Sequence, residues 1–174
     1  MRELSAKVCI LGDFAVGKTS TVERFVNNHF SDKYLTTIGV KVDTKDILLS
    51  GDMTLKLVLW DVAGTDRFGD VEFAYLRGAS GFIFVADGTR AETIETVRNL
   101  KAQSDERYGG VPDVLLINKS DLADDWEVSN DLQESMRGHF SDLFVTSAKA
   151  GNNVDAAIER LGSLIAERDF SLRS

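Results

Sequence analysis

GDFAVGKT, residues 12–19, is the stretch of this sequence that decides the fold. It fits the pattern G-x-x-x-x-G-K-[ST], in which loop N–H groups turn toward one point and a helix aims its positive end there. Gly17 lets the backbone approach an oxyanion, Lys18 can reach terminal phosphates, and the Thr19 hydroxyl can ligate magnesium. We therefore favour a phosphate-binding loop over an ordinary glycine-rich turn before a helix. Its expected nucleotide contacts are Asp13, Phe14, Ala15, Val16, Gly17, Lys18, Thr19 and Ser20.

Short apolar runs occur on either side of this loop, and they suit buried parallel strands because they are apolar on both faces. They lie at residues 7–11, 81–86, 114–117 and 143–145. The segments 40–43 and 55–60 alternate between apolar and polar residues and enclose a turn signal at 50–52. This arrangement predicts an antiparallel hairpin at an edge of the sheet.

Two stretches carry the 3.6-residue period of an amphipathic helix. One follows the loop and the other lies near the C-terminus; their apolar positions are Val22, Phe25 and Val26, and Val154, Ala157, Ile158, Leu161, Leu164 and Ile165. Strands that alternate with helices predict an α/β domain with helices on both faces of a mostly parallel sheet. We expect residues 1–174 to form a single domain whose ligands lie beyond the carboxyl ends of its strands.

The composition excludes several classes of protein. The 174 residues carry 20 Lys and Arg against 28 Asp and Glu, a net charge of −8. A surface of that sign repels phosphate backbones, so we expect no nucleic-acid partner. With no run of ~18 apolar residues and no secretory signal, we expect a cytoplasmic protein that meets membranes only peripherally, through partners. The single cysteine, Cys9, excludes an internal disulfide, and we expect it to be a buried apolar side chain.

A second motif, Trp60-Asp61-Val62-Ala63-Gly64, ends another expected strand. The Asp61 carboxylate can hold a magnesium ion through water, and the N–H of Gly64 can bind a γ-phosphate. Taken alone, the pair is more often a capping aspartate and a turn glycine. Behind a phosphate-binding loop, at about the distance of one hairpin, it supports a nucleoside triphosphate site.

A third motif, Asn118-Lys119-Ser120-Asp121, follows the run at 114–117. The Asp121 carboxylate can accept hydrogen bonds from N1–H and the exocyclic amine of guanine, a donor pair that adenine lacks. Asn118 can connect this loop to the phosphate loop, and the stem of Lys119 can lie on the base. The backbone of a fourth motif, Ser147-Ala148-Lys149, can contact the guanine oxygen.

These four motifs, in this order, resemble those of the Ras superfamily of small GTPases, over residues 7–168. The chain is most similar to the Rab branch, through residues 37–40, 60–64, 67–68 and 75–79. The resemblance implies a P-loop NTPase G domain with a six-stranded, mostly parallel sheet, one antiparallel edge hairpin and about five helices. It also implies GTP or GDP bound with Mg²⁺.

The resemblance assigns further residues to this site. Thr37 becomes a magnesium ligand beside Thr19 and Asp61, Phe30 packs edge-on against guanine, and Tyr34 covers the phosphates. From the residues alone, Phe30 could equally be a core side chain and Thr37 the start of a strand. The expected catalytic residues are Lys18, Thr37, Gly64 and Thr65.

The chain departs from the family at two positions. Thr65 stands where the family usually has a glutamine that orients the attacking water, a feature in which the chain resembles the Rap branch. Phe14 stands where a glycine or serine is usual, and its ring would compete for the volume of a trans-acting arginine worth ~10³–10⁵ in rate. We therefore expect tight GTP binding and slow hydrolysis without an arginine finger; the alternative is that Phe14 turns toward solvent.

Our leading interpretation is a guanine-nucleotide switch with weak GTPase activity. A GTP-bound scaffold or effector-binding protein with negligible hydrolysis is the alternative, favoured by Phe14 and Thr65. An adenine-nucleotide enzyme is a third, against which Asp121 argues. The resemblance implies a monomer whose effectors, exchange factors and GTPase-activating proteins bind residues about 34–41 and 64–76. Because residues 169–174 contain no cysteine for prenylation, we expect no covalent lipid anchor in this chain.

Overall fold

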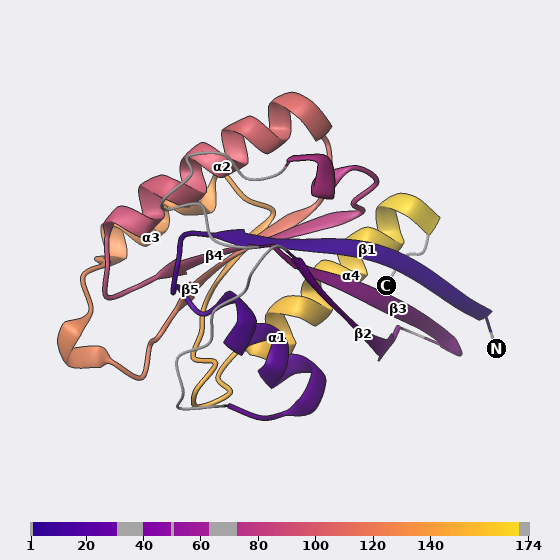
Figure 1. Cartoon of the computed structure of the whole chain (residues 1–174), viewed down its shortest axis with the longest axis horizontal. Helices are drawn as coiled ribbons and strands as arrows, with labels where there is room; N and C mark the ends of the chain where they lie inside the picture. The colour runs from indigo at the N-terminus through magenta and orange to yellow at the C-terminus, as the bar shows by residue number, and fades with distance from the viewer. Residues whose placement is uncertain (1, 31–39, 50, 63–72, 171–174) are drawn as a thin grey trace.

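The phosphate loop connects the first strand of a central sheet to the first helix. This is seen in a computed structural model that describes residues 2–30, 40–49, 51–62 and 73–170. In that part of the chain six strands form one sheet in the order β2-β3-β1-β4-β5-β6 (Figure 1). The strands are β1 (Arg2–Gly12), β2 (Val40–Leu48), β3 (Met53–Val62), β4 (Gly81–Asp87), β5 (Asp113–Asn118) and β6 (Asp142–Val145).

The strand directions confirm the predicted α/β sheet with an antiparallel hairpin at one edge. β2 pairs antiparallel with β3, with Val40 opposite Val62 and Leu48 opposite Thr54, and the other neighbouring pairs are parallel. β1 and the hairpin are longer than their apolar cores suggest. The hairpin extends through charged residues because an edge strand keeps its ladder while its polar side chains face solvent.

Helices cover both faces of the sheet, as predicted. The described residues form four α-helices and two short 3₁₀-helices, close to the five helices expected. They are α1 (Lys18–Asn27), α2 (Glu92–Tyr108), α3 (Asn130–Arg137), α4 (Val154–Phe170), η1 (Phe73–Leu76) and η2 (Ala123–Asp125). α1 and α4 pack on one face, and α2 and α3 pack on the other (Figure 1).

Alternate residues of each strand supply the two halves of the core. Along β1, Val8 and Ile10 pack with α1 and α4, whereas Cys9 and Leu11 pack with α2. The middle strands β4 and β5 are buried at every position because helices cover both of their faces. In the predicted C-terminal stripe only Leu164 is half-buried; the other members are buried. These packed layers hold the carboxyl ends of the strands in fixed positions.

Cys9 is the buried apolar side chain that the sequence predicts. The residue is fully buried, with its thiol 3.6 Å from the carbonyl oxygen of Tyr75. Burial raises the pKa of the Cys9 thiol to about 12, and the positive charge of Lys7 offsets only part of that effect. The thiol therefore stays protonated near neutral pH. Among the described residues, no helix is both long and apolar enough to cross a bilayer.

Candidate functional site

The four motifs lie at one end of the sheet. β1 ends at Gly12, β3 at Val62, β4 at Asp87, β5 at Asn118 and β6 at Val145, and these carboxyl ends lie at the same edge of the sheet (Figure 1). Parallel strands bring their carboxyl ends together, which is why motifs far apart in the chain meet here. This is the edge of the sheet at which the sequence analysis predicts that ligands bind.

The two glycines of the phosphate loop are required by close approaches of other groups. A Cβ atom at Gly12 would lie 2.3 Å from the carbonyl oxygen of Val85. Gly17 has a φ of 103°, and a Cβ there would lie 2.2 Å from the side-chain nitrogen of Asn118. α1 begins directly after Gly17, without a side-chain cap on its first N–H groups. The end of the helix can therefore offer those donors to an anion.

Side chains from the third motif hold the carbonyl groups of the phosphate loop. The Asn118 amide donates to the carbonyl of Val16 at 3.1 Å, and the Lys119 ammonium donates to that of Ala15 at 2.9 Å. In a trans peptide the N–H points opposite to the C=O. The N–H groups of Val16 and Gly17 therefore point away from these donors, and the predicted connection through Asn118 is present.

The side chain of Lys18 folds back over the phosphate loop. Its residue is 6% exposed, and its ammonium group donates to the carbonyl of Asp13 at 3.0 Å, across the loop. Burying an ammonium group is costly unless charges or hydrogen bonds compensate for it. Its positive charge stands at the start of α1, where the helix also presents its positive end, and this suits an anionic ligand.

Thr19 and Asp61 bring two oxygen ligands together at the mouth of the loop. The Thr19 hydroxyl donates to the Asp61 carboxylate at 2.6 Å, and Asp61 is fully buried at the end of β3. Hard divalent cations prefer such oxygen donors, and Mg²⁺ commonly takes one or two from the protein and the rest from water and phosphates. No group of three or more His, Cys, Asp or Glu side chains in the described part could hold a metal without such help. The pair therefore fits Mg²⁺ bound with a phosphate.

The third and fourth motifs are joined by hydrogen bonds. The Ser147 hydroxyl donates to the Asp121 carboxylate at 2.8 Å. The side-chain oxygen of Asn118 accepts from the Thr146 hydroxyl at 3.2 Å and from the N–H of Ala148 at 3.1 Å. Asn118 therefore contacts the phosphate loop with its nitrogen and the loop after β6 with its oxygen. Lys149, the last residue of that motif, is exposed.

The motifs do not predict Arg24 and Asp87, which also support this edge. Arg24 in α1 donates to the carbonyl groups of Ala148 and Lys149, at 2.8 and 2.5 Å. Asp87, 1% exposed, accepts from the Lys119 ammonium at 2.9 Å. The sequence does carry a signal for Asp87, because a carboxylate ends an otherwise apolar buried strand. Arg24 gave none, since a lone arginine on an amphipathic helix is ordinary.

The charge on Asp87 is stabilised by its neighbours. Burial alone would raise the pKa of this carboxyl, but hydrogen bonds from Thr89 and Lys119 outweigh that effect and hold the pKa below its ordinary value. The carboxylate is therefore ionised near neutral pH and can anchor cations beside the phosphate loop.

The remaining predicted site residues are placed only in part. Phe30 is half-buried just after α1, and within the described segments neither core cluster includes it. Phe14 is half-buried, and Ser20 is half-buried in the first turn of α1. Four predicted site residues lie outside the described residues: Tyr34, Thr37, Gly64 and Thr65.

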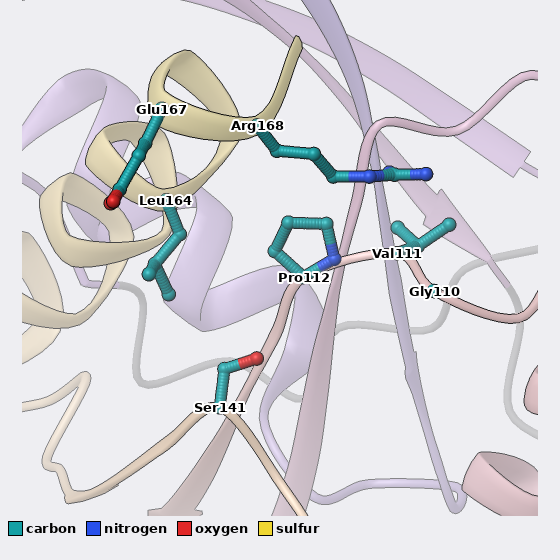
Figure 2. A pocket seen from close by; sticks show the side chains of 7 residues that line it. All are labelled: Gly110, Val111, Pro112, Ser141, Leu164, Glu167 and Arg168. Atoms are coloured by element: carbon teal, nitrogen blue, oxygen red, sulfur yellow. The ribbon is translucent and has the colours of Figure 1, made fainter. Parts of the chain in front are cut away.

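A hollow of about 570 Å³ lies away from these motifs (Figure 2). Gly110, Val111 and Pro112 before β5 line it, together with residues near the end of α4. In Figure 2 the Arg168 side chain extends over Pro112 toward Val111. The hollow is at the amino ends of β5 and β6, so it is separate from the candidate site.

Comparisons with known proteins agree with this geometry. The Ras family model matches residues 7–167. The chain belongs to the Ras family. Its match to Ras-related protein Rab-32A of Dictyostelium discoideum is 38% identical over 94% of the chain and 78% of that protein. It is 35% identical to Ras-related protein Rab-13 of Bos taurus, over 97% and 81%. It is 36% identical to the Ypt/Rab-type GTPase YPT7 of Saccharomyces cerevisiae, over 89% and 78%.

The family accounts for the order of the four motifs. Ras-family proteins are small GTP-binding switches, and the three relatives named above carry Rab or Ypt/Rab names. The resemblance drawn from the motifs is therefore confirmed, as is the G-domain fold of this Ras-family protein.

Proposed function

We propose that this Ras-family protein binds GTP and GDP together with Mg²⁺ and hydrolyses GTP slowly. The observation that carries the proposal is the double contact of Asn118 with the phosphate loop and with the loop after β6. A nucleotide carries a base at one end and phosphates at the other. It therefore fits a site in which the Asn118 side chain connects the phosphate loop to the loop after β6. The contact of Asp121 with Ser147, which joins the third and fourth motifs, supports assigning Asp121 to the base end of the ligand.

Each part of the ligand has a partner in the proposal. The N–H groups of residues 15–17 and the Lys18 ammonium bind the β- and γ-phosphates. Asp121 reads N1–H and the amine of guanine, and the loop at 147–149 reads its oxygen. Thr19, Thr37 and Asp61 hold Mg²⁺, which supplies positive charge to the phosphates when bound. Phe30 packs against the base, and Tyr34 covers the phosphates.

Hydrolysis transfers the γ-phosphoryl group to water, which breaks its bond to the β-phosphate oxygen and yields GDP and inorganic phosphate. The side chain at position 65 is the one that orients that water in the proposal. The threonine hydroxyl is shorter than a glutamine amide and offers a different set of donors and acceptors. In the proposal the ring of Phe14 competes for the volume that an activating arginine would need. Slow turnover follows from both features.

The biological output of the proposal is a surface and not the released phosphate. In the proposal, loss of the γ-phosphate changes the shape of the segments around 34–39 and 64–73. Effectors, exchange factors and GTPase-activating proteins bind residues about 34–41 and 64–76. The monomeric protein works in the cytoplasm and reaches membranes through such partners. A scaffold that stays in the GTP form is the second candidate, favoured by Phe14 and Thr65.

The nucleotide that the purified protein releases on denaturation tests the proposal. We expect a guanine nucleotide in about stoichiometric amount, because Asp121 discriminates against adenine. Liquid chromatography of the released nucleotide identifies it. GDP supports a protein that turns over, and GTP supports the scaffold. An adenine nucleotide, or no binding of either guanine nucleotide on re-addition, contradicts guanine-nucleotide binding altogether.

Changing Thr65 to glutamine tests the explanation of slow hydrolysis. We expect Thr65→Gln to raise the single-turnover rate about tenfold, below the ~10²–10⁴ that a well-positioned proton-transfer group can contribute. Phe14→Gly in the same assay tests whether the phenyl ring at position 14, where the family usually has glycine or serine, also slows hydrolysis. Thr44→Gln, the same change at an exposed position of β2, is the matched control and should leave the rate unchanged. If neither Thr65→Gln nor Phe14→Gly raises the rate, these side chains do not limit hydrolysis.

A further inference from the structure

The backbone of Phe14 is held on both sides by polar groups. Its N–H donates to the Asp13 carboxylate at 2.8 Å, and its C=O accepts from the Arg90 guanidinium at 2.7 Å. The Asp13 carboxylate in turn accepts from the Thr96 hydroxyl of α2 at 2.8 Å. The start of α2 and the turn before it therefore contact the phosphate loop at two points.

Arg90 is itself fixed in place. Its Nε atom donates to the Asp87 carboxylate at 3.1 Å while its Nη2 atom donates to Phe14. Its backbone lies in the turn that leads into α2, where its N–H bonds to Asp87 and its C=O accepts from Thr93. A guanidinium can make two such bonds at once because its donors form a rigid planar fork. Arg90 therefore bridges a buried carboxylate and one peptide group of the phosphate loop.

That peptide group decides which way the N–H of Ala15 points. The C=O of Phe14 and the N–H of Ala15 belong to one planar trans peptide and point in opposite directions. If the peptide rotated, the carbonyl would face the phosphates and repel them. Asn118 and Lys119 fix the next two carbonyls in the same way, so Arg90 completes a row of three.

We propose that Arg90 is a positioning residue for phosphate binding, which holds the Phe14 carbonyl outward so that the Ala15 N–H faces the nucleotide. The inference rests on the proposed function and adds a residue that none of the four motifs contains. Asp87 is the anchor of this contact, and it also accepts from Lys119, whose ammonium holds the carbonyl of Ala15. The turn after β4 thereby takes part in nucleotide binding.

The test measures how fast a fluorescent GDP derivative leaves the protein in excess unlabelled GDP and Mg²⁺. We expect Arg90→Ala to release it roughly ten- to a hundredfold faster, the range expected for a hydrogen bond to a charged group. Arg90→Lys should fall between Arg90→Ala and the wild type, because one ammonium group can replace only part of the fork. Arg98→Ala removes an arginine within α2 that pairs on the surface with Glu95, and this variant should stay within about twofold of the wild type.

A second measurement separates positioning from general loosening of the site. Inosine diphosphate lacks the exocyclic amine, so the affinity ratio of GDP to inosine diphosphate reports on the base loop alone. We expect Arg90→Ala to lower both affinities equally and leave the ratio unchanged. Release of GDP within twofold of the wild type overturns the inference, and so does a fall in that ratio. If Arg90→Ala does not fold, Arg90→Lys and Arg90→Gln decide the question by the same criteria. Failure of the wild type to bind GDP would instead refute the proposed function.

Discussion

Lys18→Met is expected to weaken the binding of GDP and GTP by roughly a thousandfold. Removing one partner from a buried, hydrogen-bonded charge pair costs about 2–5 kcal/mol, which corresponds to about thirty- to several-thousandfold in affinity. The Lys18 ammonium lies inside the phosphate loop, where little solvent screens it. Methionine keeps much of the length and volume of the stem, so the change removes mainly the charge. Titration calorimetry with GDP and Mg²⁺ measures the loss.

The stability of the nucleotide-free protein distinguishes this effect from unfolding. Lys18→Met removes the desolvation cost of a buried ammonium group and also loses its hydrogen bond to Asp13, two effects of opposite sign. The unfolding temperature of the free variant should therefore stay close to that of the wild type. Lys41→Ala is the control, because this lysine is half exposed and its ion pairs with Glu23 and Asp43 are long, at 3.7 and 3.6 Å. Undiminished affinity in Lys18→Met would show that the loop does not bind phosphate as proposed.

Asp121→Asn should change which base the protein prefers. Guanine presents two donors to this position, and an asparagine amide offers one uncharged acceptor and one donor group in place of a carboxylate. We expect GDP affinity to fall about a hundredfold, as for the loss of one charged and one neutral hydrogen bond. Xanthine carries a carbonyl where guanine has its amine, so the asparagine amide can donate to it. Xanthosine diphosphate should therefore bind the variant more tightly than GDP does.

Competition between the two nucleotides for a labelled ligand measures this reversal. The variant keeps a side-chain oxygen that can accept from Ser147, so the loop contact seen at 2.8 Å can persist. Asp124→Asn, the same change at an exposed position in η2, should leave the preference for GDP intact. A retained preference for GDP in Asp121→Asn would remove Asp121 from base recognition.

The order and type of most elements follow from local patterns in the sequence. The loop at 12–19 predicts a strand before it and a helix after it, and β1 and α1 are found there. The alternation at 40–43 and 55–60 predicts the edge hairpin, because one face of an edge pair meets solvent. These inferences succeed because hydrophobic periodicity reports which faces are buried.

The bracing of the site could not be predicted in the same way. Arg24 and Arg90 act on loops that are distant in the sequence, and only the order of the strands brings them together. Both arginines donate to backbone carbonyl groups. Because every residue type has such a carbonyl group, the sequence does not show which ones accept a hydrogen bond from an arginine. Sequence motifs contain the residues that are expected to contact the ligand. The side chains that orient the loop backbone by binding its carbonyl groups come from other elements, and tertiary packing determines which they are.

The missing side chain of Gly17 has a consequence for how the protein can vary. The space that its Cβ would fill is taken by the Asn118 amide, the same group that also reaches the loop after β6. Even one methyl group at position 17 would push that amide aside and disturb its contacts with the phosphate loop and with the loop after β6 together. A substitution at position 17 therefore cannot change how the proposed ligand binds at one end without also changing how it binds at the other.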